Sequence, residues 1–437
     1  MRFLGALLQQ RTHRLAFGLG VVLCVVGLSI SIALPIMLPV FRFPHPGGPY
    51  EIGTLTYHWV DASRQEVFST DPKARRELMV QIWYPAKGDL STPPPPRAPY
   101  VQDGNALAAA LARLKHVPEF IFEQLKYVTT NAIPSAAVAD DKPDYPVLIF
   151  LEGAIGFRQM NTFQVEALVS HGYIVAAIDQ PYTAASVAFP DGHQASALPL
   201  DQMMPLIHQS YSPAAIAPIL KGRTFEKGIV PYLAQDVGFT LNQLNNLNQA
   251  DPNAILTGRL DLQHIGTFGV SLGGIVGSDA CRLEPRLRAC LYMDAPMPVD
   301  VVQSGLQQPT LWLTRDAETM RLERRRSGGW SEADISEHQT TMRRAFENQR
   351  GQQDQQSQGY FVQIPGMFHV NLTDIPYWSP LLPWLGVTGP IDGQRAHSII
   401  NAYSLAFFDK HLLGRPQVLL DGPARQYPEV FFEKRQP

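Results

Sequence analysis

The stretch Gly269-Val270-Ser271-Leu272-Gly273 decides how the rest of the chain is interpreted. It follows a largely apolar run at 264–268 and leads into 274–277, which begins and ends with glycine. This order predicts a strand, a sharp turn that carries a serine, and a helix packed close to a sheet. Only very small residues fit beside such a turn, which holds the serine hydroxyl above the sheet. We therefore predict that Ser271 is a nucleophile.

Length and composition indicate a globular protein with a large core. The chain has 437 residues, a formal charge of -3 and 45% hydrophobic residues, which is typical of an enzyme rather than of a disordered chain. The near-neutral charge gives no sign of nucleic-acid binding. Length alone would permit two or three domains, but no repeat or second domain is evident. We expect one catalytic domain over 41–437.

Residues 15–40 form an uncharged run that is long enough to cross a bilayer. As a helix the run would span about 39 Å, against a hydrocarbon core of about 30 Å. Arginines at 2, 11 and 14 precede it, and only Arg42 follows closely, so the charge bias places the N-terminus inside. We expect a basic tail at 1–14, an uncleaved transmembrane signal anchor at 15–40 and an extracytoplasmic catalytic domain. The alternative is a signal peptide cleaved near Ala33, which would give a secreted or periplasmic protein.

Short apolar runs alternate with helical patterns through the remaining chain. Runs typical of buried parallel strands lie at 145–151, 173–178, 265–270, 287–293, 310–314 and 361–364. Two earlier segments alternate polar and apolar residues and are typical of antiparallel strands, at 51–60 and 76–84. This alternation predicts an α/β fold with a mainly parallel central sheet and helices on both faces.

Helical patterns lie at 105–115, 118–127, 162–171, 232–248, 331–350 and 398–413. Between 184 and 230 the chain shows no regular pattern, and a loop of that length usually shapes a site. A glutamine-rich stretch at 352–358 indicates a polar loop without evident chemistry.

Serine is a poor nucleophile at neutral pH, so it needs a base and an acid that orients the base. In the α/β-hydrolase fold the chain order is serine, acid, histidine. His369 is the preferred base, because it lies in a glycine-containing turn after the last predicted strand and before the closing helix. The later histidines, His397 and His411, lie on that helix instead.

Two aspartates compete for the role of the acid. Asp294 ends the strand that comes after the helix following Ser271, and Asp316 follows the next strand. Both strands end at the same edge of a parallel sheet, so the residues alone leave this choice open. The oxyanion hole is expected to use the backbone N–H groups of Leu272, next to the nucleophile, and of Ala154, in the turn after the early buried strand.

The cysteines and glycine-rich turns indicate no metal or cofactor. Cys24, Cys281 and Cys290 lack zinc-like spacing, and the turn at 153–156 lacks the lysine of a phosphate-binding loop. We expect Cys281 and Cys290 to be free core thiols, with a disulfide between them as the alternative for an exported domain. Nothing in the sequence addresses the oligomeric state.

Five motifs occur in one order along the chain: Phe-Pro-Asp-Gly at 189–192, Gly-Val-Ser-Leu-Gly-Gly at 269–274, Met-Asp-Ala-Pro at 293–296, Gly-Met-Phe-His at 366–369 and Phe-Phe-Asp-Lys-His-Leu at 407–412. Together they resemble the secreted and lipoprotein-type platelet-activating factor acetylhydrolase family, which is related to dienelactone-hydrolase-like esterases. The similarity runs from about 50 to 413.

The resemblance implies a calcium-independent serine esterase without a cofactor, which removes short or oxidised sn-2 acyl chains from phospholipids. It also favours Asp294 as the acid and keeps Asp316 in reserve. One departure is Glu152-Gly153, where the family has His-Gly; a carboxylate there would tune the histidine or repel anionic head groups, while the backbone donor at Ala154 is retained. The alternatives are a general carboxylesterase or lipase on neutral esters, and a catalytically inactive binding protein with this fold.

Overall fold

The α/β body of the protein is built on one ten-stranded sheet. The computed structural model describes residues 2–88, 93–349 and 358–435, with the backbone alone over 2–15. The strand order is β14-β13-β12-β11-β10-β4-β5-β2-β1-β3. Their bounds are β1 Glu51–Gln65, β2 Arg75–Ala86, β3 Ala132–Pro134, β4 Tyr145–Leu151, β5 Ile174–Asp179, β10 Leu260–Val270, β11 Leu287–Met293, β12 Thr310–Thr314, β13 Gly359–Gln363 and β14 Phe431–Lys434.

The centre of the sheet is parallel, and antiparallel pairs lie toward both ends, with a parallel pair of β1 and β3 at one edge. From β5 to β13 each neighbouring pair is parallel. Strand β2 pairs antiparallel with both β5 and β1, and β14 pairs antiparallel with β13. The predicted α/β fold with a mainly parallel sheet is therefore confirmed. It also follows that β10, which leads into Ser271, lies between β11 and β4 near the middle of the sheet.

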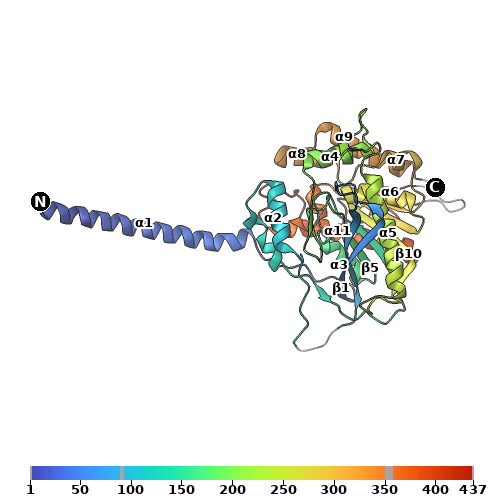
Figure 1. Ribbon diagram of the computed structural model, residues 1–437, viewed down its shortest axis with the longest axis horizontal. Coiled ribbons are helices and arrows are strands. Elements are labelled where there is room, and N and C mark those ends of the chain that lie inside the picture. Colours follow the sequence, from blue (N-terminus) through green and yellow to red (C-terminus); the bar gives the residue numbers. More distant parts are fainter. Residues whose placement is uncertain (1, 89–92, 350–357, 436–437) are drawn as a thin grey trace.

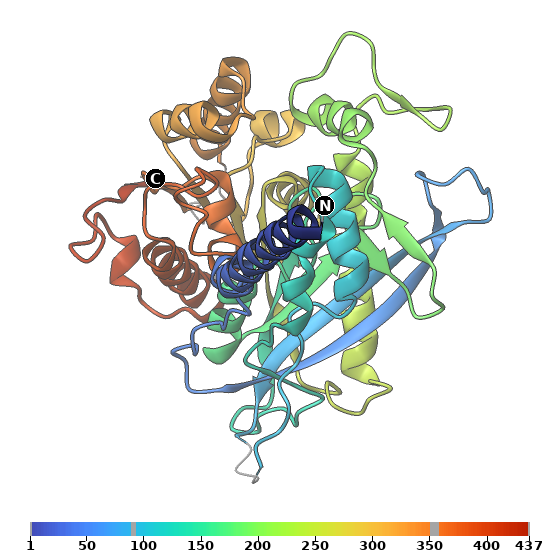
Figure 2. The same cartoon turned by 90° about the vertical axis from the view of Figure 1, so that its left-hand side faces the viewer.

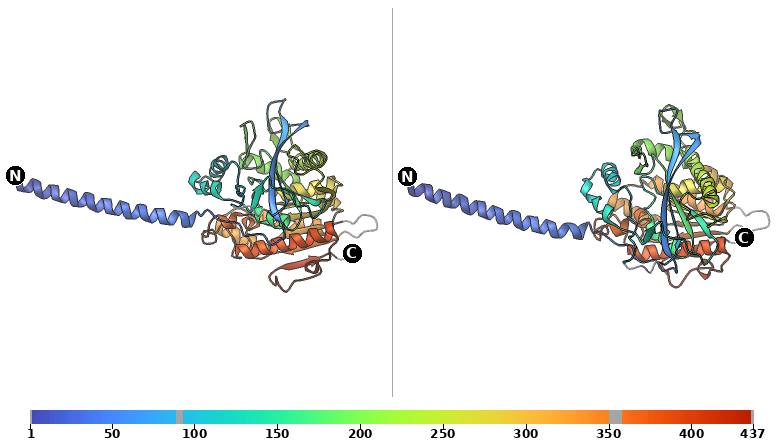
Figure 3. Two further views of the ribbon diagram at one scale, coloured as in Figure 1. Left: turned by 90° about the horizontal axis from the view of Figure 1, so that it is seen from below. Right: turned by 60° about the horizontal axis from the view of Figure 1, so that its bottom comes forward.

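Helices cover both faces of this sheet, because its inner strands are apolar on both sides. Along β4 the side chains of Val147, Ile149 and Leu151 belong to one core, and those of Leu148 and Phe150 belong to the other. The first core is closed by α5 (Val230–Gln249), α6 (Leu272–Leu283) and α9 (Glu332–Glu347). The second is closed by α3 (Thr162–Ser170) and α11 (Gly393–Leu413), which lie across the sheet from α5 (Figure 3).

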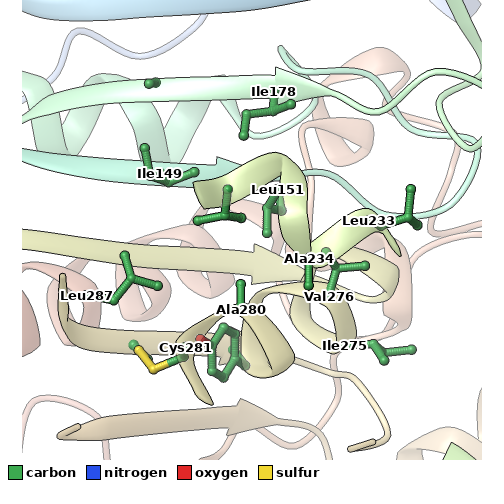
Figure 4. Close-up of a cluster of buried hydrophobic side chains, with 14 of the residues drawn as sticks. Ile149, Leu151, Ile178, Leu233, Ala234, Ile275, Val276, Ala280, Cys281 and Leu287 are labelled. Atoms are coloured by element: carbon green, nitrogen blue, oxygen red, sulfur yellow. A yellow bond between two sulfur atoms is a disulfide. The ribbon is translucent and has the colours of Figure 1, made fainter. Parts of the chain in front are cut away.

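The contact between the sheet and α6, the helix that follows Ser271, is tightly packed. Leu233 and Ala234 of α5 and Ile275 and Val276 of α6 belong to the same core as Ile149, Leu151 and Ile178 of the sheet (Figure 4). All seven side chains are at most 4% exposed. Each buried aliphatic side chain of this size contributes about 1.5–3 kcal/mol, so the start of α6 has little freedom to move.

The segment 184–230 is more regular than predicted. It contains β6 (Ser186–Ala188), β7 (Gln194–Ser196), α4 (Leu200–Tyr211), β8 (Ile219–Leu220) and β9 (Arg223–Thr224). Helix α4 escaped prediction because Pro205 lies inside it, and proline normally ends a helix. The four strands are two or three residues long, which is too short for a periodic pattern.

The helix predicted at 118–127 is wrong. That segment forms two short 3₁₀ turns, η1 (Glu119–Ile121) and η2 (Glu123–Tyr127), after the predicted helix α2 (Gly104–Lys115). Its N–H groups bond three residues back, as from Phe122 to Glu119 and from Leu125 to Phe122. Since only Gln124 and Leu125 in the two turns are buried, no apolar stripe supports a continuous α-helix.

Seven further elements were not predicted, and the glutamine-rich stretch at 352–358 lies almost wholly outside the described residues. The unpredicted elements are strands β3 and β14, α7 (Val299–Ser304), α8 (Ala317–Ser327), η3 (His369–Leu372), α10 (Ile375–Trp378) and η4 (Val418–Leu420). Of these, α8 and η3 contribute to the site described below.

The prediction of two free core thiols is also wrong. Cys281 near the end of α6 and Cys290 of β11 form a disulfide, and both are fully buried. A turn of a few residues brings the chain from α6 back into β11, which places the two cysteines side by side although they are 9 positions apart. Cys24 is free and exposed.

Helix α1 (Arg2–Met37) projects away from the body (Figure 1). Its segment Ala16–Met37 is long and apolar enough to cross a membrane, and none of it is buried. A signal sequence would have the same properties. Beyond the helix, Phe41 and Phe43 pack against the rings of Tyr100 and Tyr377. The helix therefore leaves the body beside α2, as a view along its axis shows (Figure 2).

Candidate active site

Ser271 occupies a strained turn between β10 and α6. Its backbone has φ 56° and ψ -122°, a conformation that is costly for any residue with a side chain. The N–H of Ser271 donates to the carbonyl of Met293 at 2.9 Å, and its carbonyl accepts the N–H groups of Gly274 and Ile275. These bonds, together with the packing of α6, hold the turn in place.

Two glycines are required by the closeness of this turn. A Cβ atom at Gly269 would overlap the backbone of Gly273, and one at Gly273 would overlap the carbonyl of Leu151. The turn therefore presses directly against both the start of α6 and the end of β4. This close approach explains why the sequence pattern places glycine two positions before and two positions after the serine.

The imidazole of His369 is bonded to Asp294. Asp294 directly follows β11, and His369 begins η3 after β13, so both lie at the carboxyl edge of the sheet. The Nδ1 atom of His369 is 2.6 Å from Asp294 Oδ2. The Asp294 side chain is fully buried and that of His369 is 23% exposed. This is the arrangement in which a carboxylate orients a histidine toward a nucleophile.

Asp294 has three further partners. Its Oδ2 accepts a bond from Arg315 Nε at 2.7 Å, and its Oδ1 accepts one from Thr314 Oγ1 at 2.9 Å. His338 Nε2 lies 3.2 Å from Oδ1. Burial alone would raise the pKa of Asp294, but Arg315, His338 and His369 hold it well below its usual range. The carboxyl group therefore stays ionised, as an acid that orients a base must.

Asp316, the alternative acid, has a different position. Its side chain accepts the N–H of Thr319 at 2.8 Å and the hydroxyl of Thr319 at 2.6 Å. It therefore caps the N-terminus of α8, a common role for aspartate. Among the described residues, no hydrogen bond joins Asp316 to His369.

The rest of the environment of His369 is aromatic and acidic. The backbone N–H of His369 donates to Glu323 Oε1 at 3.2 Å. The rings of Trp330 and His369 pack in a T-shaped arrangement, with 5.4 Å between their centroids. Within the part of the chain that is described, Ser271 Oγ and His369 share no hydrogen bond. Such bonds are often long in an unliganded enzyme and tighten when substrate binds.

Two backbone N–H groups lie beside Ser271. Leu272 is the first residue of α6, and the turn at 153–156 approaches so closely that a Cβ on Gly153 would be 3.2 Å from that of Ser271. Ile155 fixes this turn by donating to the carbonyl of Thr183 at 2.7 Å. Among the described residues, no hydrogen bond to a protein acceptor is found for the N–H of Leu272 or that of Ala154.

Glu152 is buried at the end of β4 and is only 2% exposed. Its Oε1 accepts the N–H of Gln180 at 3.0 Å, whereas Oε2 has no hydrogen-bond partner among the described residues. Burial, and then the charge of Asp179, raise the pKa of Glu152 well above its usual range. The side chain therefore presents no open negative charge to a substrate.

Sequence reasoning did not identify the residues around Asp294 and His369, namely Thr314, Arg315, Glu323, Trp330 and His338. Arg315 carried a usable signal, because a charged residue directly after a buried strand needs a partner. The others are recognisable only from tertiary contacts. No group of three potential metal ligands occurs among the residues that could be placed.

Comparison with known proteins gives consistent matches over most of the chain. A family model described as platelet-activating factor acetylhydrolase, isoform II, matches residues 37–417. A platelet-activating factor acetylhydrolase of Gallus gallus is 23% identical over 85% of this chain and 84% of its own length. A probable 1-alkyl-2-acetylglycerophosphocholine esterase of Arthroderma benhamiae is 24% identical over 94% of this chain and 98% of its own. A solved ferulic acid esterase from Streptomyces cinnamoneus superposes with a TM-score of 0.68 and 28% identity, over 90% of this chain and 99% of its own.

Proposed function

This chain belongs to the platelet-activating factor acetylhydrolase, isoform II family, and we propose that it is a serine ester hydrolase that works through an acyl-enzyme. The family match confirms the resemblance that the ordered motifs predicted. The observation that carries the proposal is the 2.6 Å contact between His369 Nδ1 and Asp294 Oδ2 at the sheet edge that bears Ser271. The proposed fold is that of the α/β-hydrolases.

The first half of the reaction transfers the acyl group to the protein. Ser271 Oγ attacks the ester carbonyl carbon while His369 Nε2 takes the hydroxyl proton. Asp294 stabilises the imidazolium, and the N–H groups of Leu272 and Ala154 bind the oxyanion. When the tetrahedral intermediate collapses, His369 returns the proton to the alcohol oxygen, which leaves.

The second half restores the enzyme. Water attacks the acyl carbonyl, His369 accepts its proton, and the same N–H groups bind the new oxyanion. Collapse releases a carboxylic acid, and Ser271 regains its proton. No metal ion or cofactor takes part in this scheme, so activity should not require calcium.

We propose short or oxidised acyl esters as substrates, most plainly the sn-2 acyl group of a phospholipid. The names of the two esterase relatives support this substrate class. A general carboxylesterase acting on neutral esters is the second candidate, because the ferulic acid esterase is the more identical of these proteins at 28%. The third candidate is a binding protein that has this fold but no activity. The serine of such a protein would not react with a fluorophosphonate.

We further propose that α1 anchors the catalytic domain, 41–437, on the extracytoplasmic side of a membrane, with 1–14 inside and 15–40 as the span. The Cys281–Cys290 disulfide supports this location, because disulfides persist in oxidising compartments. Cleavage of α1 as a signal peptide would instead release the domain.

The decisive experiment replaces Ser271 by alanine in the full-length protein in detergent micelles. We expect turnover of p-nitrophenyl acetate to fall by about 10⁴-fold or more. Ser278→Ala is the matched control, since it removes a buried hydroxyl from α6, the helix that follows Ser271. That hydroxyl donates to the carbonyl of Ile275. Full activity in purified, folded Ser271→Ala would refute the proposal. An acyl-length series on a phospholipid and a neutral ester, measured side by side, separates the two substrate classes.

A further inference from the structure

A second histidine lies against the carboxylate group of Asp294, and its Nε2 atom is also 3.3 Å from Thr314 Oγ1. His338, on α9, is 1% exposed, and its Nε2 lies 3.2 Å from Asp294 Oδ1. The other oxygen, Oδ2, faces His369 Nδ1 and Arg315 Nε. With Thr314 on Oδ1, the carboxylate has two partners on each oxygen, which fills its usual capacity as an acceptor.

The surroundings of His338 indicate which nitrogen carries a proton. Nε2 faces Asp294 Oδ1 at 3.2 Å and Thr314 Oγ1 at 3.3 Å, and the Thr314 hydroxyl donates its own hydrogen to Asp294 Oδ1. Both oxygens are therefore acceptors toward the ring, which places a proton on Nε2. The other nitrogen, Nδ1, is buried and has no partner among the described residues.

The position of His338 is fixed from several sides. Ile335 and Met342 of the same helix are buried, and Met342 belongs to the core on that face of the sheet. Trp330 meets the rings of both His338 and His369 edge-on, at 5.8 Å and 5.4 Å between centroids. The guanidinium of Arg315 lies over the ring of Trp330. The two histidines and Asp294 thus form one packed unit closed by Trp330.

We propose that His338 is a positioning residue of the esterase: its Nε2–H holds Asp294 Oδ1, directs Oδ2 toward His369, and withdraws negative charge from the carboxylate. This inference rests on the proposed function. The other groups that face this unit are Arg315 and Thr314 from the end of β12 and Glu323 from α8. Glu323 acts at one remove, through Arg315 and the N–H of His369.

Removal of the donor has two consequences that differ from a loss of packing. In His338→Leu, Asp294 is oriented less well, so we expect kcat to fall about tenfold with KM unchanged. The carboxylate also keeps more of its charge, which favours protonated His369. The acid limb of the kcat/KM profile should therefore move to higher pH by about half a unit. His338→Gln, which can present an N–H near the Nε2 position, should restore both properties.

The test measures the kcat/KM profile and the pKa of His369 in full-length protein labelled with ¹⁵N-histidine. His411→Leu is the control, because His411 is a half-buried histidine that bonds to Tyr360 at the start of β13, away from Asp294. The NMR titration is repeated in Ser271→Ala, where it reports on His369 whether or not the serine is the nucleophile. A pKa of His369 that is higher in His338→Leu than in wild type, but unchanged in His338→Gln and His411→Leu, supports the proposal.

An unchanged pKa of His369 and an unchanged kcat in His338→Leu would overturn it. If His338→Leu does not fold, His338→Gln is compared with His338→Asn, whose shorter amide mimics Nδ1 rather than Nε2. Equal profiles for these two variants would also overturn the proposal. Retained activity in Ser271→Ala refutes the proposed function instead, so the two failures are distinguishable.

Discussion

Two carboxyl groups are buried at neighbouring strand ends on either side of Ser271, and they are in opposite states. Asp294 follows β11 and Glu152 follows β4, and both are at most 2% exposed. Partners surround Asp294, and its pKa lies well below the usual range. Glu152 receives one backbone N–H and lies near the negative Asp179, and its pKa lies well above that range. Burial is common to both, so the partners decide the charge.

The difference follows from where the arginines point. Arg315 pairs with Asp294, whereas Arg158 pairs with Asp179, and among the described residues no cation pairs with Glu152. A charged carboxylate can orient a histidine and stabilise its protonated form, whereas a neutral carboxyl group only forms hydrogen bonds with its neighbours. Glu152, at the position where the resemblance implies a histidine, thus has a backbone N–H as its partner rather than a cation.

The largest expected effect is the loss of the Asp294 charge. In Asp294→Asn, the amide no longer stabilises the imidazolium, and we expect kcat to fall by about 10³–10⁴-fold. Asp316→Asn should change kcat little, because that side chain only caps α8. Turnover of p-nitrophenyl acetate measures both variants. A large loss in Asp316→Asn with little loss in Asp294→Asn would reverse the assignment of the acid.

Removal of Arg315 should make Asp294 behave more like Glu152. Arg315→Met leaves Asp294 and Glu323 without their shared buried cation, so the free energy of unfolding should fall by about 3–5 kcal/mol. Urea unfolding measures this loss. Arg321→Met is the control, since Arg321 pairs with Glu318 and Glu332 at the surface and should contribute little. Equal stability of the two variants would mean that Arg315 does not support Asp294.

The raised pKa of Glu152 predicts a pH-dependent stability. The unfolded chain releases the Glu152 proton above the ordinary pKa, while the folded chain keeps it, so the contribution of Glu152 to stability declines as pH rises. Relative to wild type, Glu152→Gln should become more stable between pH 5 and pH 8, by at most about 1.4 kcal/mol per unit. Asp294 has the opposite sign: its contribution is present above the ordinary carboxyl pKa and declines only in more acidic solution.

Urea unfolding at several pH values measures this difference. If the stability difference between wild type and Glu152→Gln does not vary with pH, Glu152 is ionised in the folded protein and the contrast with Asp294 fails.

The smallest effect is expected for the activity of Glu152→Gln at neutral pH. The amide oxygen can still accept the N–H of Gln180, and no charge is lost, so kcat/KM should stay within about threefold of wild type. The ratio of phospholipid to neutral-ester hydrolysis should also be unchanged. A shift of the acid limb in this variant would show that a charge at Glu152 reaches His369.

The parts of the fold that were predicted accurately are those with local signals. Strands β4, β11 and β12 have the predicted bounds, because uninterrupted apolar runs end at polar or turn-forming residues. Helix α4 contains proline, and β14 is a four-residue edge strand, so neither carries a clear pattern. The disulfide was missed because the spacing of two cysteines does not reveal that a helix end and a strand lie side by side.

The candidate site shows the same division. Ser271 and His369 were singled out by turn chemistry and chain order, which are local properties. Asp294 and Asp316 end adjacent parallel strands, so residue order could not separate them, and the preference for Asp294 came from the family resemblance. In the structure the two differ through Arg315, His338 and Thr319, and these partners depend on how helices α8 and α9 pack. The catalytic roles of Ser271, Asp294 and His369 stay predictions until the variants above are measured.

The disulfide between Cys281 and Cys290 links the stability of the domain to the redox state of the compartment in which it folds. It closes a loop of about ten residues between the helix that begins after Ser271 and the strand that ends before Asp294. Such a loop contributes about 2–3 kcal/mol through the entropy of the unfolded chain. A change of that size alters the unfolded fraction roughly a hundredfold, and degradation acts on that fraction. The abundance of this protein should therefore follow the oxidising capacity of the compartment in which it folds.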